Sequence, residues 1–246
     1  MQKEKPRLSF EIGATSFPGT MHEWQDRIHA DTLRLIFAVA DGVSGDLTPK
    51  NNGAVAAQAL LRLLRADPNF CSDLPKAIEK ANRDMMGLRA TDETIGGTTI
   101  TAARIADGVL HVANVGDSPA YLIRGNRITQ LHSRDSGVFG GLEQRVMKDD
   151  GLRVHQRRVT LQPEDLIVIA SDGIVRPIRS LIWNPDPSVK RGDIRILVSV
   201  KEILGAVQSS QTLQDAVFAL LNLIAGKKSY TGDDMSMIMI KAIARD

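Results

Sequence analysis

LRLIFAVADG, residues 33–42, is a run of mainly apolar residues that stops at an aspartate followed by glycine. A short apolar run that ends in a turn signal is typical of a buried strand. The glycine allows the backbone to turn sharply and to come close to whatever the aspartate holds. We therefore expect a strand over residues 33–40 that places Asp41 at its end.

The same ending recurs in DLIVIASDG, residues 165–173, where Asp172 precedes a glycine. Two further acidic turns adjoin predicted strands, one with Asp117 and one with Asp233-Asp234. Any one of them is most simply a common turn. If the strands share one sheet pair, however, the four turns converge, and crowded carboxylates repel unless a cation neutralises them. Oxygen ligands without His or Cys suit magnesium or manganese.

The remaining pattern predicts an α+β fold. Several strands follow one another directly, and Gly116-Asp117 and Gly125-Asn126 are interpreted as tight turns between antiparallel neighbours. Amphipathic helices occur in pairs between the strand groups, which favours packed sheets with helix pairs on their outer faces. The expected strands are 7–15, 33–40, 97–106, 109–115, 118–124, 128–131, 165–170 and 235–243, and the expected helices are 51–65, 73–89, 199–209 and 213–225.

The composition excludes several classes of protein. The 246 residues carry 31 basic and 29 acidic side chains, a net charge of +2, and only 4% aromatic residues, which argues against nucleic-acid binding. Because no Pro/Gly/Ser-rich linker interrupts the chain, we expect a single domain over residues 1–246.

The cellular setting is also inferred from the sequence. The lone Cys71 allows no internal disulfide and no CxxC zinc site. The charged N-terminus is not a secretory signal, and no uncharged apolar stretch approaches the ~20 residues that span a membrane. We expect a cytoplasmic monomer that does not enter membranes.

Five motifs in order resemble the metal-dependent protein phosphatases (PPM, type 2C serine/threonine phosphatases), in their bacterial single-domain form. The resemblance extends over residues 26–240, nearly the whole chain. It implies a four-layer αββα sandwich, in which two antiparallel sheets pack face to face with helix pairs outside. The motifs are DGVSG (41–45), GGTT (96–99), NVGDSPAYL (114–122), SDG (171–173) and DDMS (233–236).

The resemblance also implies roles for individual residues. Asp41 would bridge two metal ions, and the Gly42 carbonyl would bind one of them. Asp172 and Asp233 would complete the shell of the second ion. Asp117 matches the aspartate of a third, weaker metal position, and Asp26 matches an acid that orients a metal-bound water. The catalytic set is thus Asp41, Asp172, Asp233 and Asp26, and the metal-binding set is Asp41, Gly42, Asp172, Asp233 and Asp117.

The implied activity is hydrolysis of phosphoserine and phosphothreonine in phosphorylated proteins. Two Mn or Mg ions about 4 Å apart share a water, lower its pKa and favour in-line attack on phosphorus. A cognate serine/threonine kinase is a candidate partner. The alternative is a catalytically weak or inactive family member that acts as a regulatory binding module. A phosphatase specialised for one regulatory partner, such as an anti-sigma-antagonist switch, is a further alternative.

Three departures from the family pattern bear on the site. Met21 stands where many members carry a phosphate-binding arginine, so the metals and water alone, or Arg27 or His22, would hold the phosphate. Val43 replaces the histidine that some relatives use as general acid. The segment 133–158 is shorter and more divergent than the flap on which substrate specificity usually depends. Apart from these departures, the segment 176–201 is interpreted as an irregular insertion after the Asp172 turn, an ordinary loop in preference to a partner-binding surface. GGTT lacks the ending of a P-loop, so we interpret its glycines as packing a strand near the metals.

Overall fold

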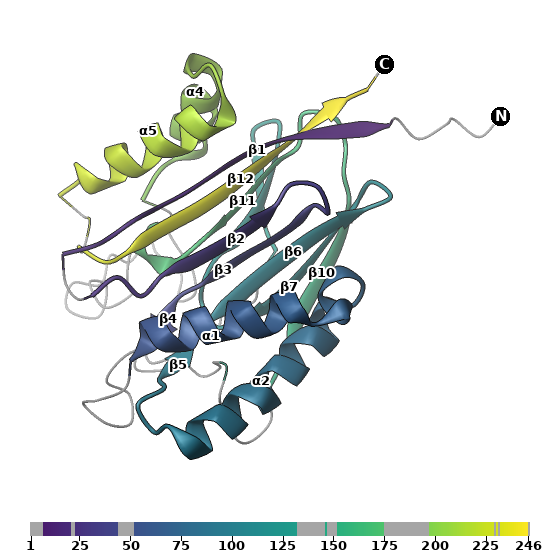
Figure 1. The fold of residues 1–246 in the computed structure, drawn as a ribbon. Helices are drawn as coiled ribbons and strands as arrows, with labels where there is room; N and C mark the ends of the chain where they lie inside the picture. The colour runs from purple at the N-terminus through teal and green to yellow at the C-terminus, as the bar shows by residue number, and fades with distance from the viewer. Residues whose placement is uncertain are drawn as a thin grey trace, which may run out of the picture.

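The computed structural model describes residues 7–20, 23–43, 52–131, 146, 152–174, 197–228, 230 and 232–245. Within them lie two five-stranded antiparallel sheets with helix pairs on the outer faces (Figure 1). Among these residues, no helix combines the length and apolar character needed to cross a membrane. The α+β class and the four-layer arrangement expected from the sequence are confirmed.

The first sheet joins the two ends of the described chain. In spatial order it contains β1 (Leu8–Phe17), β12 (Met235–Ala244), β11 (Leu166–Ala170), β8 (Ala120–Arg124) and β9 (Arg127–Gln130). The pair α4 (Val200–Ser209) and α5 (Leu213–Ala225) covers its outer face (Figure 1). Both helices begin with a capping box, formed by Ser199 and Glu202 in α4 and by Thr212 and Asp215 in α5. These side chains accept hydrogen bonds from free N–H groups at the start of each helix.

The second sheet contains, in spatial order, β10 (His155–Thr160), β7 (Val109–Val115), β6 (Ile100–Ala106), β3 (Ile36–Ala40) and β2 (Arg27–Asp31). Helices α1 (Gly53–Ala66) and α2 (Leu74–Thr91), joined through the 3-10 turn η1 (Pro68–Cys71), cover its outer face. A short ladder of β4 (Gly42–Val43) and β5 (Gly97–Thr98) continues beyond β3.

The position of β3 in the fold explains why residues 36–40 are all apolar. Successive side chains of a strand point to opposite faces. Phe37 and Val39 enter the core between the two sheets, and the alternate residues Ile36, Ala38 and Ala40 enter the core beneath α1 and α2. A strand covered on both faces therefore needs apolar residues at every position. Strands β11 and β12 divide their side chains in the same way between the inter-sheet core and the core beneath α4 and α5.

The expected strand over residues 33–40 is too long at its beginning. Residues 32–35 form the turn between β2 and β3, with Leu35 at a φ of 54° and Leu33 96% exposed. The apolar character of these leucines thus does not reflect strand burial. Similarly, the expected strand over 97–106 is divided at Thr99, because β5 pairs with β4 whereas β6 pairs with β3.

The interpretation of Gly116-Asp117 as a hairpin turn is wrong. Strand β7 pairs with β6 and β10 in the second sheet, whereas β8 pairs with β9 and β11 in the first. The chain therefore crosses between sheets at this point, and Gly116 takes a φ of 95° there. A local turn signal predicts a reversal of direction but does not determine which sheet receives the next strand.

Three strands were not expected from the sequence, namely β2, β10 and the short β4. β2 and β10 are the edges of the second sheet, and β10 is largely exposed. Edge strands of this kind lack the apolar alternation by which strands are predicted. Strand β10 begins in the divergent segment 133–158 and continues past it to Thr160. In the segment 176–201, Ser199 caps α4, which begins at Val200. Residues 132–145, 147–151 and 175–196 lie outside the described residues.

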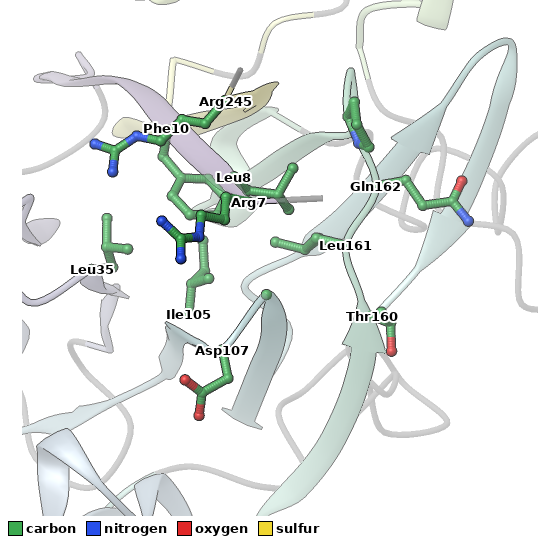
Figure 2. Close-up of a pocket in the computed structure, with 12 residues that line it drawn as sticks. Arg7, Leu8, Phe10, Leu35, Ile105, Asp107, Thr160, Leu161, Gln162 and Arg245 are labelled. Carbon is green, nitrogen blue, oxygen red and sulfur yellow. The ribbon is translucent and has the colours of Figure 1, made fainter. Parts of the chain in front are cut away.

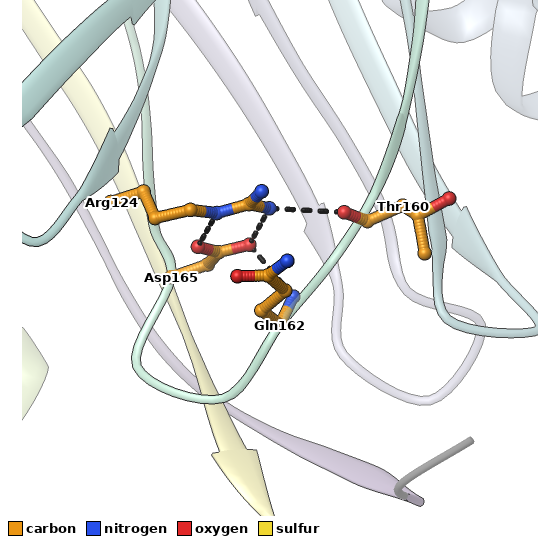
Figure 3. Close-up of polar contacts among 4 residues, drawn as sticks. All are labelled: Arg124, Thr160, Gln162 and Asp165. Atoms are coloured by element: carbon orange, nitrogen blue, oxygen red, sulfur yellow. Dashed lines mark hydrogen bonds and ion pairs between the residues drawn. The ribbon is translucent and has the colours of Figure 1, made fainter. Parts of the chain in front are cut away.

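An ion pair between half-buried Arg124 and buried Asp165 fastens β8 to the segment between β10 and β11 (Figure 3). The Arg124 guanidinium donates from Nε and Nη2 to the two carboxylate oxygens of the fully buried Asp165, each at 2.7 Å. Arg124 also donates to the Thr160 carbonyl at 3.0 Å, and the Gln162 N–H donates to Asp165 at 2.8 Å. This bidentate geometry satisfies a carboxylate that has no access to water.

Replacing Arg124 with Gln leaves the Asp165 carboxylate buried without its counterion. We expect a loss of about 2–4 kcal/mol in the free energy of unfolding, because removing one partner of a buried pair is costly. The 39% exposure of the Arg124 side chain lowers this value below that of a fully enclosed pair. Urea denaturation provides the measurement. Arg127→Gln, on the exposed strand β9, is the matched control and should change stability by less than about 0.5 kcal/mol. Equal effects of the two variants would contradict a structural role for the pair.

Candidate metal centre

Strand register brings the predicted aspartates to one end of the sandwich. Ala40 pairs with Arg27, so Asp41 and Asp26 adjoin the same end of the β2–β3 pair. Ala170 pairs with Met237, so Asp172 and Asp233 flank the corresponding end of the β11–β12 pair. Asp117 lies in the β7–β8 crossover between the two sheets.

Asp41 is fixed through its backbone by two threonines of the GGTT motif. Its N–H donates to Thr99 Oγ1 at 3.1 Å, and its carbonyl accepts from Thr99 N–H at 2.8 Å and from Thr98 Oγ1 at 2.9 Å. The Thr99 hydroxyl also bonds the Ser118 hydroxyl at 2.6 Å. The two threonines of the GGTT motif therefore support Asp41 and link it to the crossover that carries Asp117.

Gly42 lies where no side chain would fit. A Cβ atom at this position would be 2.2 Å from the Gly53 carbonyl oxygen, because the beginning of α1 packs directly on β4. Gly173 is equally constrained, since its Cβ would be 1.9 Å from the Asp234 carbonyl oxygen. The glycine after each aspartate thus permits close backbone packing beside the carboxylate.

The carboxylates of the site influence one another. Burial raises the pKa of Asp41 well above its usual value, and the charges of Asp26, Asp172, Asp117 and Asp233 raise it further, in that order. All five acids predicted from the sequence therefore share one electrostatic environment. A carboxylate surrounded by like charges is unfavourable unless it is protonated or neutralised by a cation.

Asp26 is the most deeply enclosed of these acids, with 1% of its surface exposed. Within the described part of the chain, neither carboxylate oxygen has a hydrogen-bond partner of good geometry. Burial raises the pKa of Asp26 to about 7, the nearby hydroxyls of Ser171 and Ser236 lower it, and the charges of Asp234 and Asp172 raise it. Ser171 Oγ accepts a hydrogen bond from Ser236 N–H at 2.9 Å, and the Ser236 hydroxyl bonds the Ser16 hydroxyl at 2.5 Å.

Asp234 positions the segment that carries Asp26, a role that sequence reasoning missed. Its carboxylate accepts from Gly19 N–H at 2.6 Å, from Gln25 N–H at 2.6 Å and from Asp26 N–H at 3.4 Å. Asp234 is 2% exposed. It precedes β12 of the first sheet, whereas Asp26 precedes β2 of the second, so its hydrogen bonds cross the sandwich. The sequence indicated an acidic turn at Asp233-Asp234, but it did not indicate that Asp234 positions the backbone of the Asp26 segment.

Arg27 fixes the same segment from the other side. Its guanidinium donates to the carbonyls of Asp26 at 2.7 Å and Trp24 at 3.1 Å, and to Gln58 at 3.2 Å. These bonds favour a positioning role over the phosphate contact considered from the sequence. Met21 and His22 lie outside the described residues. Tyr230, also missed, donates a short hydrogen bond to the Asp233 carbonyl.

The donor chemistry fits a hard divalent cation. The acids offer only oxygen ligands, and the unpartnered oxygens of buried Asp26 require a cation, a water or a proton. Among the described residues, no three His, Cys, Asp or Glu side chains are grouped closely enough to form a metal site as they stand.

Packed antiparallel sheets, outer helix pairs and acids from both sheets at one end define the metal-dependent protein phosphatase class. The chain belongs within it to the family described as Stage II sporulation protein E (SpoIIE), whose model matches residues 32–243.

Two curated relatives come from Arabidopsis thaliana. Probable protein phosphatase 2C 9 is 29% identical over 174 residues, which cover 56% of this chain and 60% of that protein. Probable protein phosphatase 2C 28 is 26% identical over 263 residues, which cover 97% of this chain and 70% of that protein. The match thus spans between 60% and 70% of the length of these relatives.

A solved structure shares the fold. The catalytic domain of the serine threonine protein phosphatase PstP, in complex with two manganese ions, aligns with a TM-score of 0.71 at 21% identity. The alignment covers 96% of this chain and 100% of that one. At this identity, the likeness concerns the fold.

Asp234→Ala tests the positioning of the Asp26 segment. The substitution leaves buried backbone N–H groups without an acceptor, and we expect a loss of about 2–3 kcal/mol in the free energy of unfolding. Hydrogen exchange at the Gly19 and Gln25 amides should accelerate by about tenfold or more, as measured by NMR. Asp84→Ala, on the surface of α2, is the matched control. Unchanged exchange at both amides in the Asp234 variant would refute the role assigned to this carboxylate.

Proposed function

We propose that the chain is a metal-dependent phosphatase that hydrolyses phosphoserine and phosphothreonine in phosphorylated proteins. Asp41, the Gly42 carbonyl, Asp172 and Asp233 would hold two Mn or Mg ions, and Asp117 would contribute to a third position. When bound, such cations activate water and neutralise charge on phosphoryl oxygens. A cognate kinase partner, a monomeric state and a cytoplasmic location belong to the same proposal.

The observation that carries the proposal is the environment of Asp41. Its pKa is raised by burial and by four other carboxylates that come from both sheets. Conformational stability alone does not favour such an arrangement, because burial and the charges of the other acids disfavour the ionised form of Asp41. A binding site for cations explains why the fold brings these groups to one end.

The residues of the chain would perform distinct tasks. The threonines of the GGTT motif bind the backbone of Asp41. The main chain that carries this carboxylate is therefore fixed in position. Asp234 and Arg27 secure the backbone around Asp26, so that its unpartnered oxygens stay in place. From there, Asp26 would accept a hydrogen bond from a water and orient it. The acids would also repel a phosphate dianion when no cation is present, so substrate binding would depend on metal.

The relatives support the substrate class and the metal. Both plant relatives carry the name protein phosphatase 2C, and the PstP catalytic domain was solved with two manganese ions. The proposed chemistry needs no covalent intermediate, and the one cysteine is exposed at the end of η1, between α1 and α2.

A regulatory binding module without turnover is the second candidate. The replacement of the usual phosphate-binding arginine by Met21 favours it. The two candidates differ in one respect that is simple to measure. An enzyme turns over phosphorylated substrate in the presence of metal, whereas a binding module does not.

Asp41→Asn provides the decisive test. The wild type should hydrolyse a phosphothreonine peptide and p-nitrophenyl phosphate with Mn²⁺ and lose this activity in EDTA. We expect the variant to lower kcat/KM by roughly a hundredfold or more, because a central oxygen ligand with its charge is removed. Asp84→Asn, a carboxylate on the surface of α2, should retain wild-type activity.

The same variant distinguishes a lost ligand from a damaged fold. Because the pKa of Asp41 is raised in the folded state, the ionised carboxylate opposes folding at neutral pH. Asp41→Asn should therefore match or exceed the wild type in thermal stability when metal is absent, and bind Mn²⁺ more weakly by calorimetry. No Mn²⁺ binding and no turnover in the wild type would contradict the proposed enzyme.

A further inference from the structure

A cavity opens at the end of the sandwich that faces away from the aspartates. It measures about 570 Å³ and lies between the sheets, where β1 begins and β12 ends (Figure 2). Strand β1 connects the two regions, since Leu8 pairs with Ala244 beside the cavity and Phe17 pairs with Met235 beside the acids. Ten residues of strand span roughly 30 Å, so the cavity is separate from the candidate metal centre.

Backbone hydrogen bonds between different elements tie the cavity walls together. Ile105 N–H donates to the Leu35 carbonyl at 3.0 Å, and Leu161 N–H donates to the Gly108 carbonyl at 2.9 Å. Arg245 N–H donates to the Arg7 carbonyl at 2.8 Å. The wall formed by residues 160–163 is further held by the Arg124–Asp165 pair (Figure 3). The cavity is thus largely preformed, as ligand sites usually are.

The lining combines apolar walls with two cations. Leu8, Phe10, Leu35, Ile105 and Leu161 supply the apolar surface. Arg7 and Arg245 also line the cavity, and Figure 2 shows them beside Phe10. Within the described part of the chain, neither guanidinium has an ion-pair partner. Asp107 lines the cavity as well, and all three charged residues are exposed, so together they leave one net positive charge at its mouth.

We propose that this cavity binds an amphipathic carboxylate, a molecule with an apolar body and one anionic head. The apolar walls would enclose the body, as in small-molecule sites of similar volume. The two guanidinium groups would receive the head, because planar guanidinium matches a carboxylate with paired hydrogen bonds. Fatty acids and aryl carboxylates share this chemistry. The proposal does not depend on phosphatase activity.

Calorimetric titration of the whole chain with decanoate tests the proposal, and 1-decanol serves as the uncharged probe. Decanoate should bind saturably with one-to-one stoichiometry. The double variant Arg7→Gln/Arg245→Gln should weaken decanoate binding by about tenfold and leave decanol binding unchanged, because only the head contact is lost. Arg83→Gln/Arg127→Gln removes two exposed arginines elsewhere and should bind decanoate like the wild type.

A second variant and a second measurement localise the ligand. Leu8→Trp, which fills the cavity, should abolish binding of both probes. In methyl NMR spectra, decanoate should shift Leu35, Ile105 and Leu161, whereas Leu60 and Leu64 in the core beneath α1 should not move. Absence of saturable binding, equal decanoate affinity in the Arg7/Arg245 double variant, or methyl shifts confined to other regions would each overturn the proposal.

Discussion

Repulsion among carboxylates is the constraint around which one end of this sandwich is arranged. Asp41 is surrounded by the charges of four other acids, and burial strengthens their mutual effect. Such a group of acids persists only if the surrounding backbone is fixed by other means. The threonines that hold Asp41, and the N–H groups that Asp234 accepts, supply this support from both sheets. The stability of the fold therefore derives from its three apolar cores, while the end that carries the acids is held by backbone hydrogen bonds.

Both sheets contribute residues to the candidate site. The second sheet contributes Asp41 and Asp26, the first contributes Asp172 and Asp233, and the β7–β8 crossover contributes Asp117. No single sheet carries the whole set, so the face-to-face packing of the sheets determines the spacing of the acids. The inter-sheet core, with Phe37 and Val39 facing Ile238 and Ile240, is consequently part of the functional architecture as well as of the stability.

The sequence predicts those elements whose burial extends to both faces. β3, β11 and β12 are recognisable because each is apolar at successive positions, and the Asp-Gly endings of two of them indicate where the site lies. β2 and β10 were missed because edge strands carry polar residues, and the β7–β8 crossover was misinterpreted because sheet assignment depends on distant pairing. The resemblance assigned a role to Asp233 but none to Asp234, whose positioning role depends on N–H groups that only the structure places beside it. The metal-binding roles of the individual acids remain sequence predictions.

The pairing of β1 with β12 has a consequence for how the chain reaches its native state. The two strands pair over their full length, and contacts such as that between Ser16 and Ser236 join residues 220 positions apart. Closing so long a loop is entropically unfavourable, and folds rich in such contacts form slowly. Asp233 and Asp234 immediately precede β12, so they reach Asp26 only when this late pairing forms. During synthesis, Asp233 and Asp234 would therefore join Asp26 and Asp41 only after β12 has been added, when most of the apolar core is available to oppose their repulsion.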